Sequence, residues 1–187
     1  MSLELRDFAG SDGEAVNRVA LAAFQQYRSL YTGWEEFARR ISGMAALAES
    51  AEIVVASLDG RIVGAVAYVA PGRPRASFFA PEWAVLRMLV VEPASRGLGL
   101  GRALANECLR RARRDGAAFI ALHTSPIMEV ALALYASLGF EQMHAAPPIH
   151  GVPYNIYLKP LAPGAIGDKS ARSGAAALEP RKQTRLS

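Results

Sequence analysis

The chain has one cysteine, three histidines and no apolar run long enough to cross a membrane. The single cysteine, Cys108, excludes an intramolecular disulfide, and no His or Cys pair has the spacing of a metal site. The longest strongly apolar stretch, Trp83–Val91, is interrupted by Arg87 and falls far short of the ~20 residues of a membrane helix. No export signal is recognisable near the N-terminus. We therefore expect a cytoplasmic protein that uses neither a metal nor a membrane.

Most of the net charge of +4 lies in the last part of the chain, because residues 161–187 carry five Lys or Arg against two acidic residues. This segment is rich in Gly, Ala, Ser and Pro and lacks aromatic residues, which predicts a flexible basic tail. An arm for nucleic acid is the alternative, but the charges are scattered and no aromatic side chains are present to stack on bases. We therefore expect one domain over residues 1–160 and no nucleic-acid partner.

The order of hydrophobic patterns in residues 1–160 predicts an α/β domain with a mixed sheet and helices on both faces. Ser11, three residues before Glu14, is expected to cap the first helix, and Asp59-Gly60 to form a tight hairpin turn. The last two strands are expected to meet at a Pro-rich turn. The other expected elements are a helix over 34–48, a strand over 83–91, a helix over 99–114, a strand over 118–124 and a helix over 128–138.

A glycine-rich stretch, "SRGLGLGRAL", follows the strand over 83–91 and opens the next helix. The first amides of a helix have no internal partners and lie at the positive end of its dipole, so they can bind a phosphate group. A dinucleotide fingerprint would need a third glycine at Arg102 or Leu104, and a nucleoside-triphosphate loop would need Gly-Lys-Ser/Thr. The spacing disfavours both ligands.

Arg96, Gly99 and Gly101 match the pattern R/Q-x-x-G-x-G/A, and "ALALYASLGF" at 131–140 matches A-x-x-L-Y-x-x-L-G-F. With both segments in this order and spacing, the chain resembles the GNAT superfamily of N-acetyltransferases over about residues 1–160. The resemblance implies a mixed, mostly antiparallel sheet of about seven strands, about four flanking helices and splayed central strands. It also implies acetyl-CoA as the acyl donor, without a metal.

In such proteins the strand before the loop receives the pantetheine arm, and the loop amides surround the pyrophosphate. Carried onto this chain, the strand positions are Met88, Leu89, Val90 and Val91, and the loop positions are Arg96, Gly97, Leu98, Gly99, Leu100, Gly101 and Arg102. Arg96 or Arg102 is expected to meet the 3′-phosphate. Met128 stands where many relatives carry an Asn that touches the arm, and Thr124 or Ser125 is the alternative contact.

Acetyl transfer to an amine needs a base for the amine and an acid for the departing thiolate. The resemblance makes Tyr135 the candidate acid, although an aromatic core residue is the simpler interpretation of its helical spacing. His123 is a candidate base because an ordinary imidazole titrates near pH 6.5, and Glu82 is the rival. A structural histidine and a solvated glutamate are the corresponding alternatives.

Tyr27, Tyr31, Arg87 and Tyr154 are the expected acceptor-binding residues; for Arg87, pairing with a carboxylate is the alternative. The four arginines at the end of the helix over 99–114 are expected to form a solvated face, and Cys108 to be buried. We predict an N-acetyltransferase that acts by direct attack of a primary amine, either a small molecule or a peptide N-terminus. A non-catalytic acyl-CoA sensor is the rival function, and a homodimer remains open.

Overall fold

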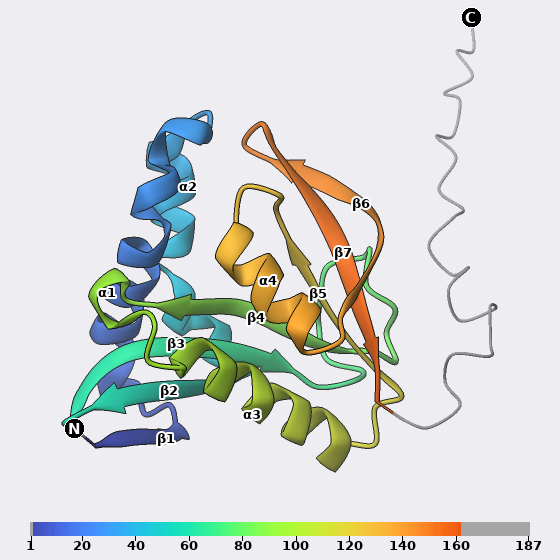
Figure 1. The fold of residues 1–187 in the computed structure, drawn as a ribbon, viewed down its shortest axis with the longest axis horizontal. Helices are drawn as coiled ribbons and strands as arrows, with labels where there is room; N and C mark the ends of the chain where they lie inside the picture. The colour runs from blue at the N-terminus through green and yellow to red at the C-terminus, as the bar shows by residue number, and fades with distance from the viewer. Residues whose placement is uncertain (1, 162–187) are drawn as a thin grey trace, which may run out of the picture.

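The computed structural model describes residues 2–161, so the predicted tail beyond Leu161 lies outside the described residues. Seven strands form one sheet in the order β1-β2-β3-β4-β5-β7-β6, in which only the β4–β5 pair is parallel (Figure 1). The predicted fold class is therefore confirmed. The strands are β1 (Leu3–Asp7), β2 (Glu52–Leu58), β3 (Arg61–Val69), β4 (Ala84–Val91), β5 (Phe119–Thr124), β6 (Glu141–Ile149) and β7 (Val152–Pro160).

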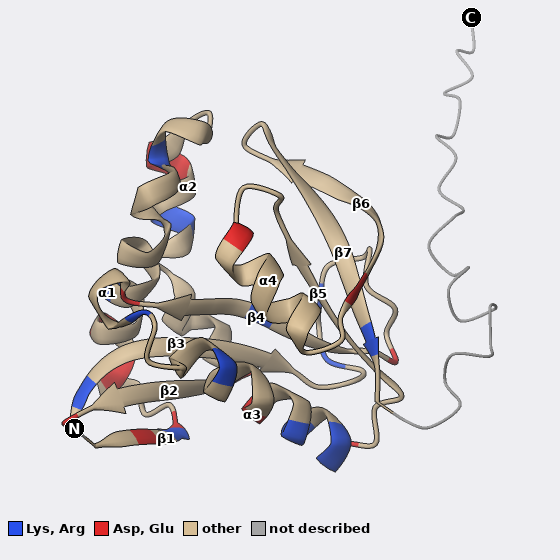
Figure 2. Ribbon diagram, in the orientation of Figure 1, with Lys and Arg blue, Asp and Glu red and all other residues tan. Residues whose placement is uncertain are grey.

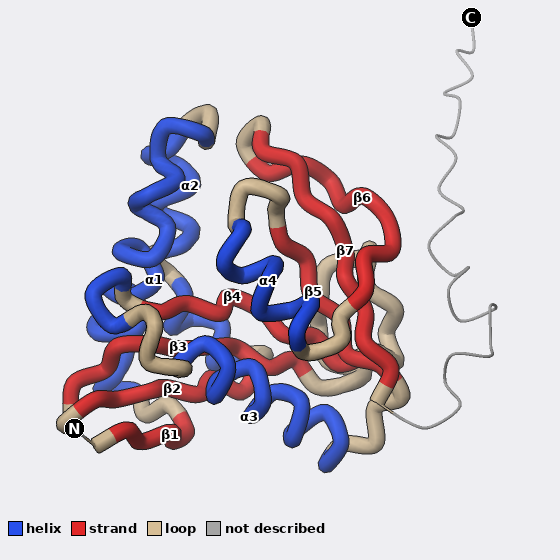
Figure 3. The backbone as a smooth tube through the Cα atoms, in the orientation of Figure 1, coloured by secondary structure: helices blue, strands red, loops and turns tan. Residues whose placement is uncertain are grey.

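Helices cover both faces of this sheet (Figure 3). They are α1 (Gly13–Phe24), α2 (Trp34–Ile41), α3 (Leu100–Arg114) and α4 (Glu129–Ser137). Alternate residues of one strand serve two cores: Val55 of β2 packs in the cluster with α1 and α2, and Val54 packs in the cluster with α3. Burial on both faces explains why β2 and β3 read as almost continuous apolar runs. Cys108 is fully buried in the α3 cluster, as predicted.

The sheet is open at its centre, between β4 and β5. These two strands pair at only two positions, Ala84 with Ile120 and Val85 with Ala121, and then separate. On its other edge β4 contains a bulge against β3, where Met88 takes a positive φ of 54°. The predicted splay of the central strands is thus present, and it leaves the later residues of β4 without a partner on the β5 side.

Two predictions about the first helices were wrong. The helix expected over 34–48 breaks after Ile41 and resumes as a 3-10 turn, Met44–Glu49, because Gly43 is a poor helix former and Ser42 Oγ bonds back to the Arg39 carbonyl oxygen. Ser11 makes no cap bond to α1. Instead the buried carboxylate of Asp12 accepts from the Ala9 amide and pairs with Arg6.

The Pro-rich turn was also misplaced. Pro147 and Pro148 lie inside β6, at a bulge, and the hairpin turns at His150 and Gly151, which both have positive φ. Proline lacks a backbone donor, but β6 is an edge strand, so its outer side loses no ladder bond. The turn at Asp59-Gly60, in contrast, forms as predicted with positive φ at both residues.

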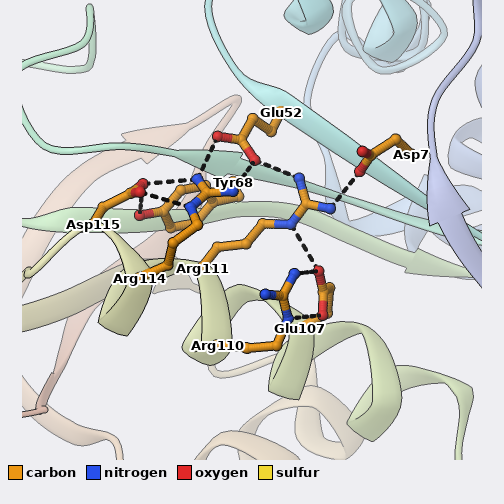
Figure 4. Close-up of polar contacts among 8 residues, drawn as sticks. All are labelled: Asp7, Glu52, Tyr68, Glu107, Arg110, Arg111, Arg114 and Asp115. Carbon is orange, nitrogen blue, oxygen red and sulfur yellow. Dashed lines mark hydrogen bonds and ion pairs between the residues drawn. The ribbon is translucent and has the colours of Figure 1, made fainter.

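The end of α3 is held by an ion-pair cluster (Figure 4). Arg111 is 6% exposed and pairs with Asp7 of β1, Glu52 of β2 and Glu107 of its own helix. Arg114 pairs with Glu52 and Asp115, at 2.7 Å each. Charged residues recur along α3 (Figure 2), but the expected solvated face is wrong for Arg111, because three carboxylates replace its water.

Arg111→Leu should therefore destabilise the fold by about 1–2 kcal/mol, since it removes the cation that joins β1, β2 and α3, while Glu52 keeps Arg114 and Glu107 keeps Arg110. Arg113→Leu is the matched control, because Arg113 is exposed on the same helix and makes no ion pair with a described residue. It should change stability by less than about 0.5 kcal/mol. Urea unfolding of both variants measures the difference, and equal effects would show that the cluster adds nothing specific.

Candidate active site

The glycine loop presents a row of free backbone donors. The amides of residues 97–102 donate to no acceptor in the part of the chain that the structure describes. Gly97 and Gly99 have φ of 80° and 77°, a conformation that strains any residue with a side chain. Gly99 directly precedes α3, so the helix dipole reinforces these donors. Free amides at the start of a helix can bind an anion, and a pyrophosphate fits this set of donors.

A cavity of about 320 Å³ lies beside the loop. Its walls come from the unpaired edge of β4, the end of α1 and one side of α4. All the predicted cofactor residues line it except Met88, which lines the next cavity, and Leu98, whose side chain is 45% exposed. The apolar lining and the free strand edge suit a narrow chain with amide groups, which is the chemistry of a pantetheine arm.

Two arginines flank the same cavity. Arg96 donates to the carbonyl oxygen of Ala23 and to Oε1 of Gln26, at 3.1 Å each, and thereby ties the loop to the end of α1. Arg102 donates to Ser137 Oγ of α4 at 2.7 Å. Both guanidinium groups lie close enough to line the cavity, so either can meet an additional phosphate.

A second cavity, of about 140 Å³, occupies the gap between β4 and β5. Arg87 and Met88 line it from β4, His123 from β5, Tyr135 from α4 and Tyr154 from β7. It adjoins the first cavity, since Phe24, Leu89, Met128 and Ala131 line both. The structure thus brings the two favoured catalytic candidates, His123 and Tyr135, together in one chamber that adjoins the first cavity.

A third cavity, of about 390 Å³, opens on the other side of this chamber. It shares Arg40, Arg87, His123 and Ile149 with the second cavity. A ligand at the glycine loop and a ligand in the third cavity would therefore approach each other through the gap between β4 and β5. Such an arrangement allows two molecules to react without passing each other.

His123 sits among aromatic rings and cations. The rings of Phe78, Phe79 and Tyr154 lie with centroids 5.3–5.8 Å from its imidazole. Burial, followed by repulsion from Arg87 and Arg40, lowers its pKa to about 4. The side chain is consequently neutral at pH 7 and able to accept a proton, but it is a weaker base than the ordinary value would imply.

Tyr135 is 5% exposed, and its hydroxyl has no hydrogen-bond partner among residues 2–161. Burial raises the pKa of this phenol above its usual range. The hydroxyl therefore remains protonated at neutral pH and can donate into the chamber, where Thr124 and Met128 also lie.

The remaining predicted residues are dispersed. Tyr154 reaches the chamber and shares a buried hydrogen bond of 2.6 Å with Tyr31, which itself lines none of the three cavities. Tyr27 lines the first cavity and not the chamber. Glu82 is exposed before β4 and lines none of the three, so the structure does not bring this rival base to the chamber.

Sequence reasoning missed Arg40, Phe78 and Phe79. Arg39 and Arg40 are both exposed on α2, but Arg40 lines the second and third cavities and Arg39 does not. In "EEFARR" only the place of Arg40, three residues after the buried Phe37, distinguishes the two. Phe78 and Phe79 belong to the loop before β4, which carries no periodic pattern.

The depressed pKa of His123 has a direct spectroscopic consequence. Its imidazole shifts in an NMR titration should stay constant from about pH 8 to about pH 5.5 and change only toward pH 4. Burial and the two neighbouring arginines are the reason, so Arg87→Gln should raise the midpoint toward the ordinary value. His123→Gln assigns the resonance. A wild-type midpoint near 6.5 would contradict the environment described here.

Comparisons with known proteins agree with this geometry. No match was found among curated proteins. A PaiA N-acetyltransferase from Thermoplasma acidophilum, solved in complex with coenzyme A, superposes with a TM-score of 0.68 at 20% identity, over 86% of this chain and 99% of that one. A GNAT family acetyltransferase from Brucella melitensis, solved with acetyl-CoA, gives 0.59 at 22% identity, over 87% and 90%.

The ribosomal-protein-S18-alanine N-acetyltransferase from Escherichia coli gives a TM-score of 0.62 at 19% identity, over 86% of this chain and 95% of that one. At these identities the likeness establishes the fold. Among the described residues, no helix is long and apolar enough to span a membrane, and no group of three or more His, Cys, Asp or Glu could hold a metal.

The family assignment itself rests on the sequence. The profile of the acetyltransferase (GNAT) family matches residues 14–140, a segment that runs from the start of α1 to the end of the predicted tyrosine motif. It covers more than half of the chain and contains both the glycine loop and Tyr135. This chain belongs to the GNAT acetyltransferase family.

Proposed function

We propose that this protein is an N-acetyltransferase that moves an acetyl group from acetyl-CoA to a primary amine by direct attack. The observation that carries the proposal is the set of adjoining cavities through the gap between β4 and β5. One end offers free amides for a pyrophosphate, the centre holds His123 and Tyr135, and the far end is open to a second molecule.

The donor side follows from the loop and the strand edge. Acetyl-CoA, when bound, supplies the thioester. The amides of residues 97–102 would hold its pyrophosphate, and the unpaired edge of β4 would bond to the pantetheine amides. Arg96 or Arg102 would meet the 3′-phosphate. Met128 fills the position of the expected Asn, and its thioether accepts a weak hydrogen bond from Thr124, so the arm contacts apolar surface there.

Two side chains would handle the protons. As the amine nitrogen bonds to the carbonyl carbon, the neutral imidazole of His123 accepts the proton that the nitrogen loses. As the carbon–sulfur bond breaks, the Tyr135 hydroxyl donates its proton to the sulfur. Because His123 is a weak base, proton loss is expected to accompany or follow bond formation, when the nitrogen is most acidic.

Donor binding is tested by calorimetric titration with acetyl-CoA. Gly99→Glu should weaken binding by about tenfold or more, since its carboxylate would face the pyrophosphate, and the added side chain meets open space. Gly99→Gln carries the same backbone strain without the charge and should bind more tightly than Gly99→Glu. Circular dichroism checks that both variants fold. Equal affinity in wild type and Gly99→Glu would place the donor elsewhere.

Catalysis is tested with Tyr135→Phe. This change should lower kcat by about 100-fold or more while the KM for acetyl-CoA stays nearly constant, because the phenol acts on the departing sulfur. Tyr157→Phe is the matched control. The hydroxyl of Tyr157, on β7, donates a hydrogen bond to Gln142 on β6, and Tyr157 lines none of the three cavities. A wild type that binds acetyl-CoA and acetylates no amine would instead be the non-catalytic sensor.

A further inference from the structure

The third cavity combines apolar walls with positive charge. Phe78, Phe79, Val85 and Pro148 provide much of its lining. Its charged side chains are three arginines, Arg40, Arg75 and Arg87, and neither this cavity nor the central chamber is lined by an aspartate or glutamate. An excess of one sign in a largely apolar cavity favours a ligand of the opposite sign.

The three arginines differ in the hydrogen bonds that they already make within the protein. Arg75 is committed to the protein, because its guanidinium donates to the carbonyl oxygens of Ala70, Ala80 and Trp83 in the loop before β4. The negative charge of Glu82 also stabilises the charged form of Arg75. Arg40 and Arg87, in contrast, make no hydrogen bond or ion pair with any residue from 2 to 161.

These two arginines come from different elements, α2 and β4, and both line the second and third cavities, Arg40 from an exposed position. Arg87 is half-buried, and burial together with Arg40 lowers its pKa. Both repel a proton from His123. A cationic ammonium would be disfavoured beside them, whereas an anion would relieve the mutual repulsion of the two arginines.

We propose, on the basis of the acetyltransferase function above, that the acceptor is a small apolar amino acid whose carboxylate binds Arg40 and Arg87. The carboxylate would occupy the boundary of the second and third cavities, which both arginines line. The α-amine, one carbon away, would then reach His123, and the apolar side chain would extend among Phe78, Phe79 and Val85.

This placement distinguishes between the two open classes of acceptor. At the N-terminus of a peptide the group beside the amine is an uncharged amide, which leaves the two arginines without an anion. In a free amino acid the same position holds a carboxylate, which guanidinium groups bind with charge-assisted hydrogen bonds. The arginines also lower the pKa of a nearby ammonium, so the amine is presented in its reactive neutral form despite the weak base.

The test compares acceptors that differ only in the carboxylate. L-phenylalanine, L-leucine and L-methionine are each assayed beside their amides and their decarboxylated amines, with kcat/KM expressed per neutral amine across pH. The acid should be preferred over both partners by about 10- to 100-fold for at least one side chain. The proposal is overturned if, in all three series, the kcat/KM values for the amino acid and its partners are about equal, or if the amide or amine is preferred.

Variants then locate the preference. Arg87→Gln and Arg40→Gln should each bring the ratio of kcat/KM for the amino acid to kcat/KM for its decarboxylated amine toward one. The KM for the amino acid should change more than kcat. Arg39→Gln should keep the ratio, because Arg39 lies beside Arg40 on α2 but lines none of the cavities. If Arg87→Gln lowers kcat equally for acid and amine, the arginine acts on the thioester instead, and recognition of a carboxylate is refuted.

Failure of the acetyltransferase function is a separate outcome. If acetyl-CoA is bound but only amines without a carboxylate react, the function stands and the amino-acid acceptor is wrong. If no acetyl transfer occurs at all, calorimetric titration of the protein with L-phenylalanine, L-leucine and L-methionine decides. Binding that Arg87→Gln weakens about tenfold or more supports the carboxylate site, and no binding of any of the three overturns it.

Discussion

The separation of β4 from β5 is the constraint on which the site depends. A parallel pair that continued along both strands would close the sheet and bury the edge of β4. Because pairing stops after Val85, the backbone of residues 86–91 is free toward the gap, and side chains of both strands face a chamber instead of a neighbour. The loop, the catalytic candidates and the third cavity are all arranged around this one interruption.

Positive charge sets the chemistry on both sides of that gap. On the donor side it comes from backbone amides, the dipole of α3 and two arginines that border the cavity. On the acceptor side it comes from side chains, and it acts against protonation of His123. A field of this sign favours anions at both ends and neutral nitrogen bases between them, and acyl transfer to an amine requires a neutral nitrogen.

Features that depend on local chain geometry could be predicted from the sequence. The glycine loop and the start of α3 depend on a short motif whose physics is contained in a few consecutive residues. Tyr135 was singled out by the resemblance to a family, since its helical spacing alone indicates a core aromatic. Arg40 and the buried Arg111 could not be predicted in this way. Each is one arginine in a run of similar residues, and only the packing of distant strands and helices gives it a different environment from its neighbour.

The same distinction explains the errors in β6 and in the long helix. Proline is read locally as a turn residue, but Pro147 and Pro148 are tolerated in a strand because of a tertiary fact, the location of β6 at the sheet edge. The apolar spacing of residues 34–48 is genuinely helical, but Ser42 and Gly43 weaken it enough for packing to divide it. That division brings Gly43 and Met44 into the chamber wall.

The C-terminal end of α3 is anchored to the sheet and its N-terminal end is free to bind a ligand, and the anchor fixes the direction of the free end. At its C-terminal end Arg111 binds carboxylates from β1 and β2, so the helix is fixed to the half of the sheet that ends in β4. At its N-terminal end the amides are left unpaired. A helix of 15 residues is about 22 Å long and stiff, so an anchor at one end fixes the direction of the free amides at the other. Donors held in place lose little entropy when they bind an anion, and a loop without that anchor would have to be ordered by its ligand.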